Sequence, residues 1–173
     1  MHHDHKAAII ISPYRNVSEI LQRKNVTHVV SILGVSDKLP WPSAGSRQIL
    51  QLTFDDVIYT SGSFVAARRE QISDLIEFSR QWNGSGTLLV HCRAAVSRSA
   101  AGAMIAAGAL AGSDYAGLVT EVATARSYFR PNETMLRHAD DLFEVKPGLV
   151  ELIRSLRRPV RTDEWGPVTI PIR

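Results

Sequence analysis

The segment LLVHCRAAVSRSA, residues 88–100, contains the pattern that determines the expected fold. Thr87 to Val90 is a short apolar run of strand length, and His91-Cys92 opens a turn. An alanine-rich helical pattern resumes over residues 97–112. A buried strand that leads through a tight turn into a helix is typical of α/β domains. The segment therefore predicts an α/β fold in which Cys92 lies where a strand meets a turn.

The turn after Cys92 is suited to binding an oxyanion. When a turn wraps onto the N-terminus of a helix, several backbone N–H groups point into one concavity, and the helix dipole adds a favourable potential. Cys92 lies at the base of this cradle, where the same field favours the thiolate form. Arg98 can bind two phosphate oxygens in a fork, and Ser99 can place a hydroxyl beside the sulfur. The pattern predicts a phosphate site above a nucleophile.

Strand-length apolar runs alternate with helical patterns along the rest of the chain. Strands are expected at residues 7–11, 27–33 and 49–54, a loop at 38–46, and helices at 17–22, 64–82, 114–128, 132–144 and 148–157. This order predicts a twisted, mostly parallel central sheet flanked by helices. We expect one domain over residues 1–157 and an extended C-terminal tail over residues 158–173.

Composition excludes several classes of protein. Hydrophobic residues make up 45% of the 173 residues and charged residues 21%, as in an ordinary globular domain. Cys92 is the one cysteine, so no internal disulfide can form, and a reducing, cytoplasmic location is expected. The short apolar run after Lys6 does not fit a signal peptide. No apolar run reaches the roughly 20 residues that a membrane span needs.

Two further clusters of residues are interpreted as having no binding role. The net charge is +3, and Arg157, Arg158 and Arg161 are interpreted as a solvated tail rather than a nucleic-acid patch. The three histidines within residues 2–5 make a weak metal motif. We therefore expect no nucleic-acid partner, no membrane span, no metal and no cofactor.

The residues around Cys92 resemble the signature of a known family, the cysteine-dependent protein tyrosine and dual-specificity phosphatases. That signature is His-Cys, five residues, then Arg and Ser or Thr, and it matches His91-Cys92 followed by Arg98-Ser99. The similarity covers about residues 7–145, including Arg130-Pro131-Asn132. The resemblance implies a small single-domain phosphatase with the dual-specificity phosphatase fold.

The resemblance also implies a role for each residue of the segment. Cys92 would be the nucleophile and Arg98 the phosphate-binding side chain. The turn would bind the substrate through Arg93, Ala94, Ala95, Val96, Ser97 and Arg98. His91, Ser99 and Asn132 would support the turn, although Asn132 also fits a helix N-cap and Arg93 an ordinary surface position.

Ala95 departs from the family pattern, which usually has glycine three residues after the cysteine. Glycine permits backbone angles that alanine resists. If the turn needs a positive φ at this position, strain on the order of 1–3 kcal/mol follows. This departure puts catalytic efficiency in doubt more than phosphate binding.

The leaving oxygen in this chemistry needs a proton, which the family takes from an aspartate upstream of the cysteine. Asp37 and the loop Trp41-Pro42-Ser43 are two candidate positions, but serine cannot protonate a leaving group at neutral pH. Asp55 and Asp56 directly follow a predicted strand, and Asp56 lies 36 residues before Cys92. Asp56 is favoured, Asp55 stays open, and so does an interpretation in which the pair only caps a turn.

The expected function is hydrolysis of phosphate monoesters through a cysteinyl-phosphate, on phosphotyrosine or mixed phosphoprotein substrates. Ala95 also motivates a pseudophosphatase that binds phosphate without turning it over. A phosphoinositide or inositol phosphate substrate is less favoured because Val96 is not basic. A rhodanese-like sulfur carrier also uses one cysteine on such a turn, but Ser99 and the upstream aspartates favour phosphate. The pattern does not specify an oligomeric state.

Overall fold

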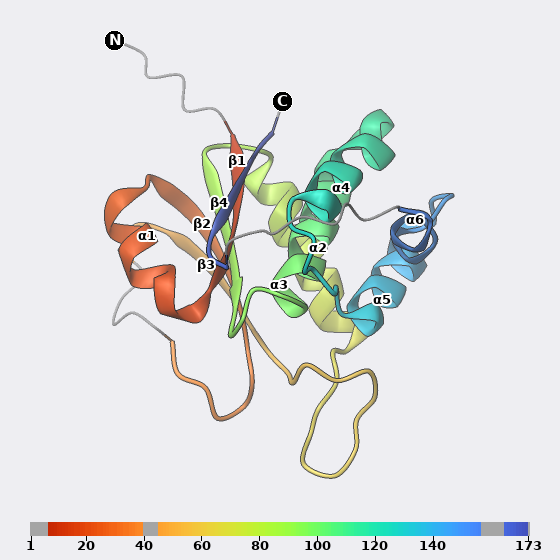
Figure 1. Ribbon diagram of the computed structural model, residues 1–173, viewed down its shortest axis with the longest axis horizontal. Helices are drawn as coiled ribbons and strands as arrows, with labels where there is room; N and C mark the ends of the chain where they lie inside the picture. The colour runs from red at the N-terminus through yellow and green to blue at the C-terminus, as the bar shows by residue number, and fades with distance from the viewer. Residues whose placement is uncertain (1–6, 40–44, 157–164, 173) are drawn as a thin grey trace.

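The core of the protein is a five-stranded sheet in the order β3-β2-β4-β1-β5 (Figure 1). The computed structural model describes residues 7–39, 45–156 and 165–172. The strands are β1 Ala8–Pro13, β2 Val26–Leu33, β3 Gln48–Thr53, β4 Thr87–Cys92 and β5 Val168–Pro171. The first four pair in parallel, and β5 runs antiparallel to β1. The predicted α/β fold with a mostly parallel sheet is confirmed.

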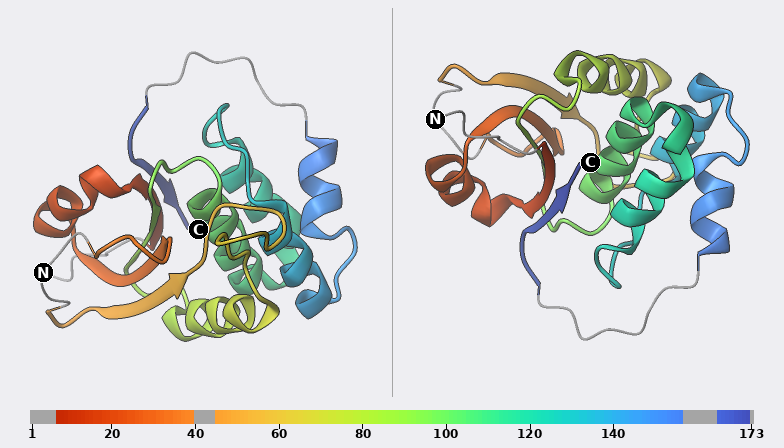
Figure 2. Two further views of the ribbon diagram at one scale, coloured as in Figure 1. Left: turned by 90° about the horizontal axis from the view of Figure 1, so that it is seen from below. Right: turned by 90° about the horizontal axis from the view of Figure 1, so that it is seen from above.

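Six α-helices cover the two faces of this sheet. They are α1 Val17–Arg23, α2 Arg69–Trp82, α3 Arg98–Leu110, α4 Tyr115–Thr124, α5 Glu133–Phe143 and α6 Leu149–Ser155, all within the described part of the chain. Figures 1 and 2 show α1 on one face and α2 to α6 gathered on the other. The predicted helices are all present, with changed boundaries.

Alternation along the strands divides the core between the two faces. Ile10 and Leu89 pack with α1 in a small cluster, whereas Leu88, Val90 and Cys92 belong to the main core on the side of α3. Successive side chains of a strand point to opposite faces. The sulfur of Cys92 is therefore directed to the same side as the helix that follows it.

A glycine brings that helix close to the sheet. A Cβ built on Gly102 would lie 2.9 Å from Cδ1 of Ile32 and 3.1 Å from Cγ1 of Val90. Larger residues at this position of α3 would push the helix off the strands β2 and β4. The close approach holds the start of α3 next to the end of β4, where the predicted cradle lies.

Helix α2 begins at Arg69, five residues later than the helix predicted from residue 64. Phe64 instead forms an isolated bridge with Ser61, which turns the preceding loop back on itself. The N–H of Arg68 donates to Oε1 of Gln71 at 3.0 Å, which is the reciprocal half of a capping box. The apolar residues before Arg69 were therefore misassigned, because they belong to a loop.

Other elements also differ from the prediction, among them β4, α4 and the C-terminal segment. Strand β4 continues two residues beyond Val90, because β1 pairs alongside it as far as the Pro13–Cys92 position. Helix α4 ends at Thr124 instead of residue 128. Residues 168–171, expected as an extended tail, form strand β5 on the free edge of β1. Pro167 before this strand and Pro171 at its end concealed it, because proline is tolerated in an edge strand and not inside a sheet.

Some predictions fall outside the described residues. These are the loop Trp41-Pro42-Ser43, the histidines within residues 2–5 and the cluster Arg157, Arg158 and Arg161. Within residues 7–39, 45–156 and 165–172, none of the helices combines the length and apolar character that crossing a bilayer requires.

Candidate active site

Cys92 ends strand β4 at the carboxyl edge of the parallel strands, where ligands bind in open α/β sheets. The residue is 2% exposed. Its Sγ lies 3.1 Å from Oγ of Ser99 in the first turn of α3, and either atom can donate in this contact. The structure thus brings together the cysteine and the serine that the sequence predicted to be neighbours.

Three carbonyl groups of the turn between Cys92 and α3 accept hydrogen bonds from backbone N–H groups outside the turn. The bonds run from the N–H of Tyr14 to the carbonyl of Arg93 (3.2 Å), from Arg130 to Val96 (2.8 Å) and from Asn132 to Ser97 (3.3 Å). In a trans peptide the carbonyl of one residue and the N–H of the next point in opposite directions. The N–H groups of Ala94, Ser97 and Arg98 therefore point away from these supports, toward the inside of the turn.

Ala95 adopts a left-handed backbone conformation, with φ at +58°. The residue is 2% exposed and packs into the main core. For a residue with a Cβ this region costs roughly 1–2 kcal/mol. The turn therefore takes the conformation that glycine favours, in spite of the alanine.

Arg98 is the first residue of α3, directly after the turn. The residue is 7% exposed, and its Nη1 donates to the carbonyl of Phe54 at 2.8 Å. Phe54 follows β3, so this bond fixes the guanidinium between two strand ends. The Nε of Arg98 is buried and has no hydrogen-bond partner among the described residues. A buried donor of this kind is uncommon and is suited to an anionic ligand.

Asp56 lies against the turn and is held from two directions. Its Oδ1 accepts from Oγ of Ser97 at 2.6 Å and from Nδ2 of Asn132 at 2.9 Å. The other end of the Asn132 side chain caps α5, because Oδ1 accepts from the N–H of Met135 at 3.1 Å. Both sequence-based interpretations of Asn132 are thus consistent with its contacts.

Asp55 is engaged elsewhere. Its Oδ2 accepts from the N–H of Val65 at 2.8 Å, and its own N–H donates to the carbonyl of Val65 at 2.7 Å. These bonds close the loop that follows β3. Of the two neighbouring aspartates, Asp56 is bonded to the turn that carries the arginine and cysteine, whereas the side chain of Asp55 is bonded to Val65.

Arg93 and Asp37 form an ion pair at the edge of the turn, with 2.6 Å between Nη1 and Oδ1. The other oxygen of Asp37 accepts from the N–H of Gly34 at 2.9 Å. The Arg93 side chain remains 74% exposed, whereas that of Asp37 is 15% exposed. Asp37, an acid candidate by sequence, therefore anchors a residue of the turn.

His91 is fully buried, and its position in the strand places it on the face opposite to Cys92. Burial lowers the pKa of His91 from 6.5 to about 4. The imidazole is therefore neutral at physiological pH. This supports an internal packing role next to the cysteine.

Two of these contacts could not be predicted from the sequence. Ser97 and Asp56 are separated by 41 residues, and Arg93 and Asp37 by 56. Neither pair follows a helical or strand spacing. Only the Gly34-to-Asp37 turn has a local pattern, since aspartate often bonds a backbone N–H nearby.

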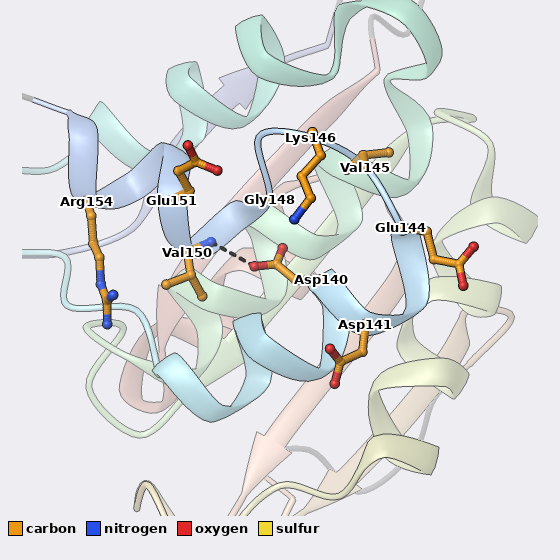
Figure 3. A pocket seen from close by; sticks show the side chains of 9 residues that line it. All are labelled: Asp140, Asp141, Glu144, Val145, Lys146, Gly148, Val150, Glu151 and Arg154. Atoms are coloured by element: carbon orange, nitrogen blue, oxygen red, sulfur yellow. Dashed lines mark hydrogen bonds between the residues drawn. The ribbon is translucent and has the colours of Figure 1, made fainter.

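A hollow of about 580 Å³ lies away from the turn, beside the loop between α5 and α6 (Figure 3). Charged residues that line it are Asp140, Asp141, Glu144, Glu151, Lys146 and Arg154. Asp140 is committed to α6, because its carboxylate accepts from the N–H of Leu149 (2.5 Å) and Val150 (3.1 Å). Across the described ranges, no group of three or more acidic, histidine or cysteine side chains is arranged to hold a metal ion.

No protein-family model matches the sequence, and no curated protein matches it. Solved structures do match the fold. A variant of human DUSP28 is 22% identical, with 79% of this chain and 89% of that chain covered and a TM-score of 0.61. A human tyrosine phosphatase-like serine/threonine/tyrosine-interacting protein is 21% identical, with 75% and 87% covered and a TM-score of 0.55.

A third similar structure is PTPMT1 in complex with PI(5)P, which is 15% identical, with 76% of this chain and 86% of that chain covered and a TM-score of 0.56. At such identities the likeness concerns the backbone. The matches span most of both chains. The chain therefore has the fold of a small single-domain dual-specificity phosphatase.

Proposed function

We propose that this protein hydrolyses phosphate monoesters through a cysteinyl-phosphate formed on Cys92. The observation that carries the proposal is the arrangement around the sulfur. A turn whose carbonyls are tied outward surrounds it, and Arg98 contributes a buried Nε with no partner among the described residues. A phosphate above Cys92 would satisfy that donor and the inward N–H groups together.

In the first step the thiolate of Cys92 attacks phosphorus, and the bond between phosphorus and the leaving oxygen breaks. Asp56 gives its proton to that oxygen as it leaves. Arg98 and the N–H groups of the turn stabilise the negative charge on the three equatorial oxygens. The contact of Asp56 with Ser97 supports this assignment, because it holds the carboxyl group at the turn.

In the second step water attacks phosphorus, and the phosphorus–sulfur bond breaks. The Asp56 carboxylate takes a proton from the water, which restores the acid for the next turnover. The electron pair of the broken bond returns to sulfur, where the hydroxyl of Ser99 can donate a hydrogen bond. Inorganic phosphate is the product, and neither proposed step uses a metal ion.

We propose phosphotyrosine or a mixed set of phosphoproteins as substrates. The names of the similar structures support a phosphatase of this class, and one of them is bound to PI(5)P. A phosphoinositide is therefore the alternative ester. A single, buried cysteine supports the proposal of a reducing, cytoplasmic location.

A second candidate function rests on Ala95. Its φ of +58° shows that the turn adopts the strained conformation, and relaxation of that strain would distort the cradle. The chain would then bind phosphate with little turnover, as a pseudophosphatase. One of the similar structures is named as a tyrosine phosphatase-like interacting protein, which supports this candidate.

The deciding experiment is hydrolysis of para-nitrophenyl phosphate across pH with a chelator present, for the native chain and for Cys92→Ser. We expect turnover that is lost in the variant, together with a phosphoenzyme in acid-quenched native samples and none in Cys92→Ser. Arg98→Lys is the matched control for phosphate binding, because it keeps the charge and removes the fork.

Each outcome separates the candidates. Undiminished hydrolysis by Cys92→Ser would contradict the proposed mechanism. No turnover by the native chain, with vanadate still bound, would identify the pseudophosphatase. Comparison of a phosphotyrosine peptide with dispersed phosphatidylinositol phosphate as substrates would then distinguish the two classes of ester.

A further inference from the structure

The exposed apolar residues of this protein gather beside the proposed active site. Of the seven large hydrophobic side chains that are exposed in the described ranges, six lie in the loops that follow β2 and β3. They are Val35, Leu39, Ile58, Tyr59, Phe64 and Val65. Figure 1 shows both loops extending beyond the turn that joins β4 to α3. Apolar residues gathered at one end of a protein mark an interaction surface more often than scattered ones do.

Backbone hydrogen bonds hold the loop after β3 in a defined conformation, so its exposed side chains have fixed positions on the surface. Ser61 and Phe64 exchange two backbone bonds, at 3.1 and 3.0 Å. Its base is closed by the bonds between Asp55 and Val65. Yet the side chains of Tyr59 and Phe64 are 73% and 58% exposed.

These side chains line a hollow of about 340 Å³ that is open to solvent, together with Val57, Ile58 and Ser61. An apolar cavity of roughly 150 Å³ admits a benzene ring. The hollow can therefore accept one bulky aliphatic or aromatic side chain. Its first lining residue, Val57, follows Asp56, whose side chain is bonded to Ser97 of the turn, so the hollow begins one residue from the proposed site.

The residues of this loop favour an uncharged side chain of a peptide over an anionic membrane as the occupant. Residues 54–67 include no lysine or arginine, and the nearest cations along the chain, Arg47, Arg68 and Arg69, lie outside this loop. An interfacial protein would instead surround its apolar side chains with cations. Across the turn, the charge of Arg93 is balanced by Asp37. The apolar side chains of residues 57–64 thus have no cation within their own loop to bind an anionic lipid headgroup.

We propose that the hollow formed by residues 57–64 binds a bulky apolar side chain of the substrate, a few residues from the phosphorylated residue. This inference rests on the proposed function and names a substrate class for it. A phosphopeptide would place its phosphate over Cys92 and its apolar neighbour against Tyr59 and Phe64. Burial of one such side chain is sufficient for about tenfold discrimination in kcat/KM.

The test uses phosphotyrosine peptides in matched pairs, with leucine or serine at each position from three before to three after the phosphotyrosine. For the native protein we expect one position at which leucine raises kcat/KM about tenfold. In Phe64→Ser and Ile58→Ser that preference should fall to about twofold or less, while hydrolysis of para-nitrophenyl phosphate is unchanged. Trp165→Ser is the control, because Trp165 is an exposed aromatic residue beside the opposite edge strand.

Two results would overturn the inference. One is an equal rate for leucine and serine peptides at every position. The other is unchanged peptide preference in Phe64→Ser combined with lost binding to phosphatidylcholine–phosphatidylserine vesicles, which would make the loop a membrane contact. Failure of the proposed function is distinguishable, because it would appear as para-nitrophenyl phosphate hydrolysis that does not depend on Cys92.

Discussion

Oγ of Ser97 donates a hydrogen bond to Oδ1 of Asp56 at 2.6 Å, and this contact ties the turn after β4 to the loop after β3. Nδ2 of Asn132 donates to the same oxygen at 2.9 Å. With two donors on Oδ1, a proton carried by Asp56 belongs on Oδ2. The arrangement thus favours Oδ2 as the oxygen that would give its proton to the leaving group in the proposed reaction.

Ser97→Ala is expected to lower kcat for an alkyl phosphate about tenfold, since it removes one hydrogen bond to a carboxyl group. The effect on para-nitrophenyl phosphate should be smaller, because its leaving group needs less help from an acid. The measurement is the ratio of the two rates. Asn132→Ser, which keeps an α5 cap and removes the donor to Asp56, should change the ratio in the same direction. An unchanged ratio in both variants would contradict the positioning role.

Asp56→Asn is expected to lower kcat on an alkyl phosphate by about 10²- to 10⁴-fold, the usual range for a lost general acid. Asp55→Asn should reduce the rate much less, because Asp55 is bonded to Val65 in the loop. Steady-state kinetics with the two variants on the same substrate make the comparison. A larger loss in Asp55→Asn than in Asp56→Asn would reverse the assignment.

Ala95→Gly is expected to raise the free energy of unfolding by about 0.5–1 kcal/mol. The left-handed φ of +58° costs alanine more than the extra chain entropy costs glycine. The control is Ala94→Gly, where φ is not positive and the entropy cost should lower stability. Urea unfolding measures both. If the strain also limits turnover, kcat of Ala95→Gly should rise.

Ser99→Ala is expected to slow the second step about 10- to 100-fold, because the departing thiolate of Cys92 loses the hydroxyl that lies 3.1 Å from Sγ. Rapid-mixing kinetics with para-nitrophenyl phosphate should then show a burst of nitrophenol followed by slow turnover. The phosphoenzyme should accumulate in quenched samples. A slower burst with no accumulation would instead place Ser99 in the first step.

Stability is expected to fall as pH decreases from about 6.5 to about 4. Burial lowers the pKa of His91 to about 4, so the unfolded chain binds a proton in this range that the folded chain does not. The maximum loss is about 3 kcal/mol. Urea unfolding at a series of pH values measures it, and His91→Gln should flatten the dependence over this range. An equal slope in both proteins would exclude His91 as the cause.

The helices and strands that were predicted correctly depend on residues that lie close together along the chain. The strand–turn–helix unit around Cys92 follows from an apolar run, a turn and an alanine-rich helix within a few turns of chain. The helix predicted to begin at residue 64 failed for the opposite reason. Phe64 is exposed, and its partner Ser61 and the Arg68–Gln71 cap, not its hydrophobicity, decide its conformation.

The amino-acid sequence alone determined four features. They are the α/β class, the cysteine at a strand end, the arginine at a helix start and the candidate aspartate pair. All of these depend on residues that are neighbours along the chain. The choice between the two aspartates, the anchoring of Arg93 by Asp37 and the apolar hollow after Asp56 depend on the sheet order β3-β2-β4. That order brings the ends of three strands together, and contacts between such ends join residues 41 and 56 positions apart, for which no periodicity exists.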